Sequence, residues 1–214
     1  QLMQPTVVSV GPLDAAAPDA IAAAQTLASA GNLTLTATPY VLDAPRRVII
    51  TSVGDDSGVI FTITGTTFGG HTVSEEVTGA NAGIASSTID FATVTSISAD
   101  GATADDVEAG TSEVAGSSWV RMDSWAAAQS AVQVNVTGTV NYSIQTTMDD
   151  PNDPSNPTDI LDVVWLDALD ANLVSESTAK SGYFNQTPTF VRLLLNSGTG
   201  SAKATIAQFG NATY

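Results

Sequence analysis

Residues 46–77 read RRVIITSVGDDSGVIFTITGTTFGGHTVSEEV, which is three short runs of β-branched residues separated by glycine-containing turns. Val, Ile and Thr favour strands, and turns such as Gly-Asp-Asp-Ser-Gly or Gly-Gly let antiparallel strands reverse. The stretch therefore predicts an antiparallel sheet. The same pattern recurs along most of the 214 residues, so we expect an all-β protein.

Period-two alternation predicts two groups of strands, separated by small polar residues at 112–118. The first group is Leu33–Ala37, Arg46–Val53, Val59–Gly65, His71–Thr78, Phe91–Ala99 and Val107–Thr111. The second group is Trp119–Asp123, Val132–Val136, Val140–Thr147, Asp162–Leu166, Thr189–Asn196 and Ala202–Phe209. We therefore predict two antiparallel β-sandwich domains, Ig-like or jelly-roll-like, over residues 31–114 and 115–214.

Residues 1–30 differ from the rest because they are rich in alanine and begin with a proline-punctuated segment. Asp19 is placed to cap a short helix over Ala20–Leu27, since alanine propagates a helix and an Asp oxygen accepts the first free amides. The alternative is an ordered arm that extends along a neighbouring subunit. The sequence leaves both interpretations open.

The charge is strongly acidic, with 22 Asp and Glu against 6 Lys and Arg and a formal net charge of −16. Phosphate backbones require clustered cations, so direct nucleic-acid binding is not expected, and anionic membranes are disfavoured for the same reason. No run reaches the length of a membrane span, and no intact signal peptide is recognisable. A basic partner surface fits this balance.

Groups that build active sites are scarce, because the chain has one His and no Cys. His71 lies at a predicted hairpin, with Glu75 and Glu76 on the following strand, and no activated nucleophile accompanies it. A surface histidine is the simpler interpretation, and a glycoside hydrolase would have only the abundance of acids in its favour. We predict no enzyme, no catalytic residue, no cofactor and no metal site.

The segment from Asp149 to Asp162 is predicted to be a long exposed loop, because three prolines exclude ladder strands and helix interiors. Its carboxylates are the hard oxygen ligands that calcium prefers. However, the loop lacks the regular Asp-x-Asp-x-Asp-Gly pattern with a distal Glu, and Asp-Pro turns are common in solvated loops. Turn formation is the first interpretation and calcium the second.

Several aromatic residues could line a sugar-binding platform; they are Trp119, Trp125, Trp165, Tyr142 and Tyr183. Trp165 in Val-Val-Trp-Leu is typical of a core position, and Trp119 is also expected to pack across strands. Trp125 is the best candidate for an exposed anchor. The arginines, which are Arg46, Arg47, Arg121 and Arg192, are expected to pair with carboxylates at strand ends or subunit contacts.

Six stretches resemble segments of small virion structural proteins of tailed bacteriophages. They are PRRVIITS (45–52), DDSGVIFTITGT (55–66), EVTGANAG (76–83), FATVTSI (91–97), VNVTGTVNYSIQTTMDDP (134–151) and VRLLLNSGTGSA (191–202). The resemblance carries no catalytic residues with it. It implies a component of a virus particle and leaves open whether that component sits on the head or the tail.

From this resemblance we expect a capsid decoration, or cement, protein that binds the outside of the major capsid protein shell. Its partners would be the major capsid protein and copies of itself in a homo-oligomer, such as a trimer, with no direct contact to nucleic acid or membrane. The alternatives are a head–tail or tail component and a host-surface or carbohydrate-binding β-sandwich module.

Overall fold

The computed structural model describes residues 5–123 and 130–208, and in them the chain is all-β with antiparallel strand pairing. It divides into two compact units. The first unit is Asp14–Ala115, and the second unit combines Gln1–Leu13 with Gly116–Tyr214. Residues 1–30, which we expected to stand apart, are thus shared between the two units, and the all-β prediction is confirmed.

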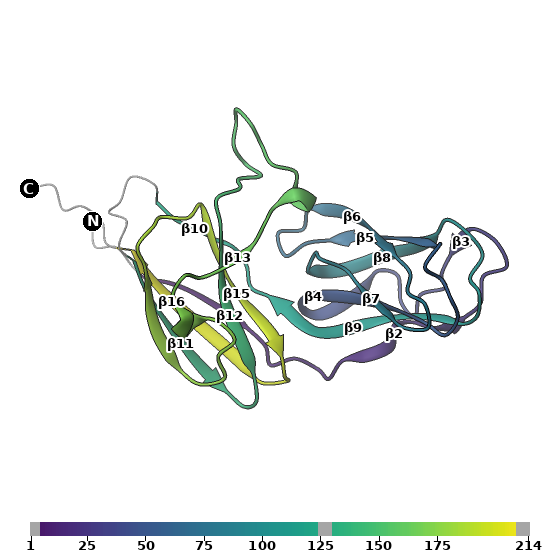
Figure 1. Cartoon of the computed structure of the whole chain (residues 1–214), viewed down its shortest axis with the longest axis horizontal. Helices are drawn as coiled ribbons and strands as arrows, with labels where there is room; N and C mark the ends of the chain where they lie inside the picture. The colour runs from purple at the N-terminus through teal and green to yellow at the C-terminus, as the bar shows by residue number, and fades with distance from the viewer. Residues whose placement is uncertain (1–4, 124–129, 209–214) are drawn as a thin grey trace, which may run out of the picture. The chain divides into compact units, whose positions relative to one another are not determined.

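The first unit holds eight of the described strands. They are β2 (Ala17–Gln25), β3 (Gly31–Asn32), β4 (Tyr40–Ser52), β5 (Ile60–Thr66), β6 (Thr72–Thr78), β7 (Ile84–Ser86), β8 (Phe91–Ala99) and β9 (Val107–Gly116). Figure 1 shows β5, β6 and β8 as one layer, and β2, β7 and β9 with much of β4 as the other. Their inward residues form the core, including the fully buried Phe61, Ile63 and Phe91.

The long strand β4 joins these two layers. Its beginning, at Tyr40 and Val41, pairs with β8, whereas its end, from Val48 to Ser52, pairs with β9. The register shifts on both sides of the strand near Arg46, as expected where a strand bends from one layer into another. Arg46 pairs with Phe91 on one side and Ala115 on the other, so it marks the bend.

The described strands of the second unit form two groups. The first has the order β1 (Thr6–Val10), β16 (Ser201–Gln208), β11 (Ser130–Thr137) and β14 (Lys180–Phe184). The second includes β13 (Leu166–Asp167), β12 (Asn141–Thr147) and β15 (Phe190–Ser197), with β10 (Val120–Arg121) also paired to β15. Short 3-10 helices lie at η1 (Ile160–Asp162) and η2 (Ala171–Leu173).

In the second unit β11 and β16 bury alternate residues, whereas β12 and β15 bury runs of consecutive residues, so apolar side chains of both groups of strands contribute to the core. Val132 and Val134 of β11 are almost fully enclosed, and so are Ile144 of β12 and Leu193 of β15. Each such aliphatic side chain contributes roughly 1.5–3 kcal/mol by leaving water. The core of this unit therefore lies between strands that are distant in sequence.

Some predicted elements are wrong. Most of the expected helix over Ala20–Leu27 lies in strand β2, which ends at Gln25, because this segment pairs with β9 across Gly110 and tertiary pairing overrides the helix preference of alanine. Leu33–Ala37 is not a strand, and the short strand β3 lies directly before it in the chain. Residues 160–162 form η1, so the strand expected at Asp162–Leu166 is reduced to β13. Strands β1, β7 and β14 had no counterpart in the prediction.

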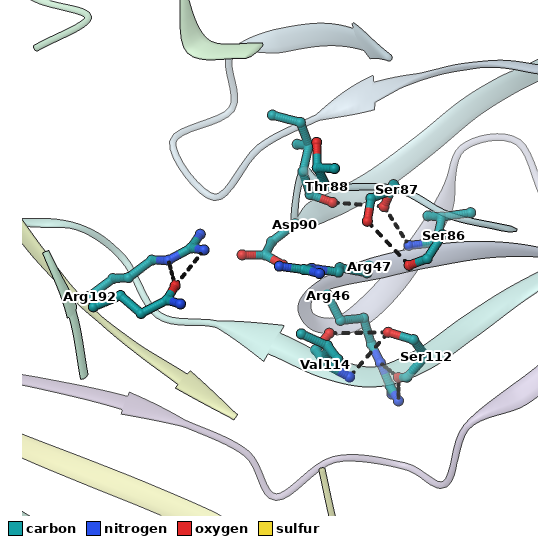
Figure 2. A network of polar contacts seen from close by, with 12 residues as sticks. Arg46, Arg47, Ser86, Ser87, Thr88, Asp90, Ser112, Val114 and Arg192 are labelled. Carbon is teal, nitrogen blue, oxygen red and sulfur yellow. Dashed lines mark hydrogen bonds and ion pairs between the residues drawn. The ribbon is translucent and has the colours of Figure 1, made fainter. Parts of the chain in front are cut away.

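The guanidinium of Arg46 fastens the bend in β4. The side chain is 1% exposed, and Nε donates to the Ser112 carbonyl at 2.8 Å, with Nη2 donating to the same oxygen (Figure 2). Nη1 donates to the Asp14 carbonyl at 3.2 Å and to both carboxylate oxygens of Asp43 at 2.9 and 3.0 Å. One cation thus ties β4 to β9 and to the start of the unit.

The stability that this network contributes depends on pH through the carboxyl group of Asp43. Burial raises its pKa, but the Arg46 side chain and the Asp14 amide, which donate to its carboxylate, outweigh burial, so the pKa lies below its usual value. A carboxyl whose pKa falls on folding stabilises the fold above its unfolded pKa, about 3.9, and that stability is lost as pH falls through the folded pKa.

We therefore expect acid to destabilise the wild-type chain more than an Asp43→Asn variant. The measurement is the thermal unfolding midpoint of both chains at several values from pH 7 down to about 2, a range that spans the usual Asp pKa. The gap between the two midpoints should narrow as pH falls below the unfolded Asp pKa of about 3.9 and on through the lower pKa of the folded carboxyl. Two curves that stay parallel over the whole range would contradict this role of Asp43.

Candidate functional site

Of the single histidine and the two glutamates that follow it on the next strand, only one glutamate makes buried contacts, and those contacts are structural. His71 is exposed beside the turn that precedes β6, and Glu76 is also exposed. Glu75 points inward and is 8% exposed. Its carboxylate accepts hydrogen bonds from the amide and hydroxyl of Thr88, at 2.6 and 2.7 Å, and from the Ile89 amide at 3.0 Å. Glu75 therefore holds the segment between β7 and β8.

The acidic loop uses most of its carboxylates on its own backbone. Asp149 accepts from the Val164 amide at 2.8 Å, Asp153 from the Ser155 amide at 2.7 Å, and Asp159 from the amide that follows it by two residues, at 2.9 Å. Within residues 5–123 and 130–208, no three His, Cys, Asp or Glu side chains gather as a metal-binding group. The geometry is that of successive turn and cap contacts.

Asp150 in this loop pairs with Arg121. Arg121 Nη2 lies 2.6 Å from Asp150 Oδ2. The hydrogen bond from Arg121 is the main reason that the pKa of Asp150 is lowered, and the same bond raises the pKa of Arg121. Both groups therefore stay charged at neutral pH, and the pair joins the loop to strand β10.

The four predicted aromatic residues that the structure describes do not meet in one platform. Tyr142 is fully buried, with its hydroxyl donating to the Thr178 carbonyl at 3.0 Å, and burial raises its pKa to about 12. Trp119 and Trp165 pack edge to face at 5.0 Å between ring centroids, and Trp119 also meets Phe190 at 5.7 Å. Tyr183 lies elsewhere, exposed on β14, and Trp125 falls outside the described residues.

Arginines cover this aromatic cluster. The Arg192 guanidinium lies 4.4 Å from the Trp165 ring centroid, and its Nε and Nη2 donate to Gln145 at 3.0 and 2.8 Å (Figure 2). Arg121 lies 5.2 Å from the Phe190 centroid. Trp119 and Trp165 are half-buried, so the core position expected for Trp165 is corrected to a stacked position under a cation.

A groove of about 240 Å³ opens at one end of the second unit. Its walls come from the end of β12, from the start of η2, and from β14 with the residues that follow it. Three of the lining side chains are apolar and strongly exposed: Met148 is 61%, Leu169 83% and Tyr183 61% exposed. The groove therefore presents exposed apolar side chains to solvent among polar ones.

Further apolar side chains continue this surface along the edge strand. Leu166 is 64% exposed, and on β13 it is the register partner of Thr146, which lines the groove. Val164 is 59% exposed, and its amide donates to Asp149, the residue after Met148. Paired residues of neighbouring antiparallel strands face the same side, so Leu166 extends the apolar surface beyond Thr146.

Asp170 fixes the rim of the groove. Its carboxylate accepts from the Asn172 amide and side chain, both at 3.0 Å, and from the Tyr183 amide at 3.3 Å. It therefore holds η2 against β14. Gly182 permits this contact, because a Cβ there would lie 2.7 Å from Leu173 Cγ.

Sequence reasoning did not place Met148, Leu169 or Tyr183 in one site. Tyr183 was considered only as part of a sugar platform, and the strand that carries it, β14, was not predicted. The available signal was weak: Leu169 stands between acidic residues in Leu-Asp-Ala-Leu-Asp, which has no strand periodicity. An exposed leucine in such a segment is the kind of residue that lies at an interface.

Comparisons of the chain with protein-family models, with curated proteins and with solved structures found no match. Among the described residues, no helix has both the length and the apolar character needed to cross a membrane.

Proposed function

We propose that this chain is a virion structural protein, a capsid decoration protein that binds the outside of the shell formed by the major capsid protein and stabilises it. The groove surface, defined by Met148, Val164, Leu166, Leu169 and Tyr183, carries this proposal. A contiguous apolar surface flanked by polar residues is typical of a protein–protein contact. The phage context comes from the sequence resemblance.

The chemistry of the described residues supports binding over catalysis. His71 is exposed without a nucleophile bonded to it, Glu75 is occupied by backbone and hydroxyl donors, and the acidic loop carboxylates serve turns. The groove itself holds one carboxylate and two side-chain amides beside its apolar walls. These groups suit recognition of a partner surface.

Stabilisation of a shell would follow from area buried across the seams between capsid subunits. A stable protein–protein contact buries about 1,200–2,000 Å² in total, and a few central apolar side chains supply most of the binding energy. Even if each contact is weak, many copies bound to one shell would together stabilise it, because the shell can open only after several contacts have broken. The acidic surface suits a protein that faces solvent and not the packaged DNA.

Counting copies in purified particles tests this proposal. Quantitative mass spectrometry against the major capsid protein should give hundreds of copies per particle. A dozen or fewer would contradict decoration and would favour the alternative, a head–tail or tail component. Particles stripped of the protein should rupture at a lower temperature than complete ones, and re-addition of the chain should restore the original temperature.

A further inference from the structure

The groove of the second unit places exposed apolar side chains next to one carboxylate. Leu169 and Tyr183 contribute the exposed apolar walls, and Asp170 lies between them in the lining. None of the lining residues is Lys or Arg. The groove thus combines exposed apolar side chains with one carboxylate and no cation.

The size of the groove indicates what it could accept. Small-molecule sites usually enclose about 300–1,000 Å³, and this groove, at about 240 Å³, lies below that range. Its volume suits one or two side chains of a protein partner, inserted as anchors. We therefore consider a polypeptide as the occupant.

The edge of β14 does not favour addition of a further strand. The Tyr183 amide already donates to Asp170, and η2 packs against Gly182. A peptide could not use this stretch of edge for a regular ladder of backbone hydrogen bonds. Recognition has to rely on side chains that enter the groove and on charges around it.

Charge decides between a second copy and a different partner. Four of the six cations, Arg46, Arg47, Arg121 and Lys180, lie within 4.0 Å of a carboxylate of their own chain. Each copy therefore presents a surplus of negative charge, with a net value of −16. Two copies of this negative chain, brought together at their grooves, would repel each other, whereas a basic partner would be attracted.

We propose that this groove binds an extended, basic segment of the partner protein, which inserts an apolar side chain between Leu169 and Tyr183 and places a Lys or Arg side chain beside Asp170. This inference rests on the proposed function, since the shell protein would supply the segment. It defines the chemistry of the partner: an apolar anchor next to a cation.

The probe is a capped five-residue peptide that contains two leucines between lysines, compared with the same peptide carrying glutamates. Binding is followed on the full chain through the methyl signals of Met148 and Leu169 in carbon–proton correlation spectra. The lysine peptide should shift these signals and bind at least tenfold more tightly than the glutamate peptide. Raising the salt concentration should weaken the binding of the lysine peptide.

Two variants make the test specific. Leu169→Ser, at an 83% exposed position, should weaken binding at least tenfold, whereas the control Val41→Ser, at a 68% exposed position in the first unit, should leave it unchanged within twofold. Both positions are exposed, so folding should survive, and a thermal melt of each variant checks this. Equal affinity for the two peptides, or unchanged affinity in Leu169→Ser, overturns the proposal.

Other outcomes separate this inference from the proposed function. If the peptide does not bind and Leu169→Ser abolishes self-association in sedimentation experiments, the occupant is a second copy and the inference is wrong. If the peptide does not bind but particles carry hundreds of copies, the inference fails while the decoration role stands. If it binds and particles carry a dozen copies or fewer, the groove assignment stands and the decoration role fails.

Discussion

Replacing Arg46 with Met is expected to lower the free energy of unfolding by about 3 kcal/mol, the scale found when one partner of a buried ion pair is removed. The 1% exposed guanidinium satisfies the Ser112 and Asp14 carbonyls as well as Asp43. Methionine fills a similar volume but donates no hydrogen bond, so these acceptors lose their donor. Chemical denaturation followed by circular dichroism measures the loss.

The location of the effect distinguishes a specific tie from general weakening. Hydrogen exchange should increase in peptides that cover the bend of β4 and the end of β9, where the Arg46 contacts lie. Lys203→Met, which removes an exposed cation from β16, is the control and should change stability little. Equal stability of Arg46→Met and Lys203→Met would contradict the role assigned to Arg46.

Arg46→Lys gives a finer test of geometry. A planar guanidinium reaches the Ser112 carbonyl and the Asp43 carboxylate at the same time, whereas a lysine ammonium is a single point of contact. The lysine variant should therefore recover only part of the stability lost in Arg46→Met. Full recovery would mean that charge alone, and not the fork of donors, holds the bend.

The sequence predicted the strands that carry their own signal. β5 and β8 alternate apolar and polar residues and end at turns, so they were located to within a residue. β2 was missed because its alanines favour a helix in isolation, and only its pairing with β9 makes it a strand. Local preference fails where a long-range partner determines the conformation.

The candidate site was less predictable for a similar reason. Met148, Leu169 and Tyr183 come from three separate segments, and their proximity depends on where β12, η2 and β14 pack. The tryptophans were predicted only in part: Trp119 and Trp165 were expected to pack in the core, and they do meet edge to face, but both rings are half-buried. Residue type alone gave no means of telling which apolar side chains would remain exposed.

Replacing Gly65 with Ala is expected to lower the free energy of unfolding by about 3 kcal/mol, near the upper end of typical overpacking costs. Gly65 lies at a bulge, where the register between β5 and β8 shifts after Thr64. A Cβ at this position would overlap the Thr93 carbonyl oxygen and lie 3.0 Å from Phe91 Cδ1. Because the obstruction is backbone, the strands would have to separate.

The matched control is Gly58→Ala, the same substitution in the turn that precedes β5. A Cβ on Gly58 would meet nothing within 4 Å, and the residue has no positive φ. Alanine there restricts the unfolded chain and should leave stability unchanged or raise it by about 0.5 kcal/mol. The measurement is the chemical denaturation midpoint of each variant, which should be lower for Gly65→Ala than for Gly58→Ala. Similar midpoints would show that β5 and β8 tolerate a side chain at the bulge, contrary to the close approach of their backbones.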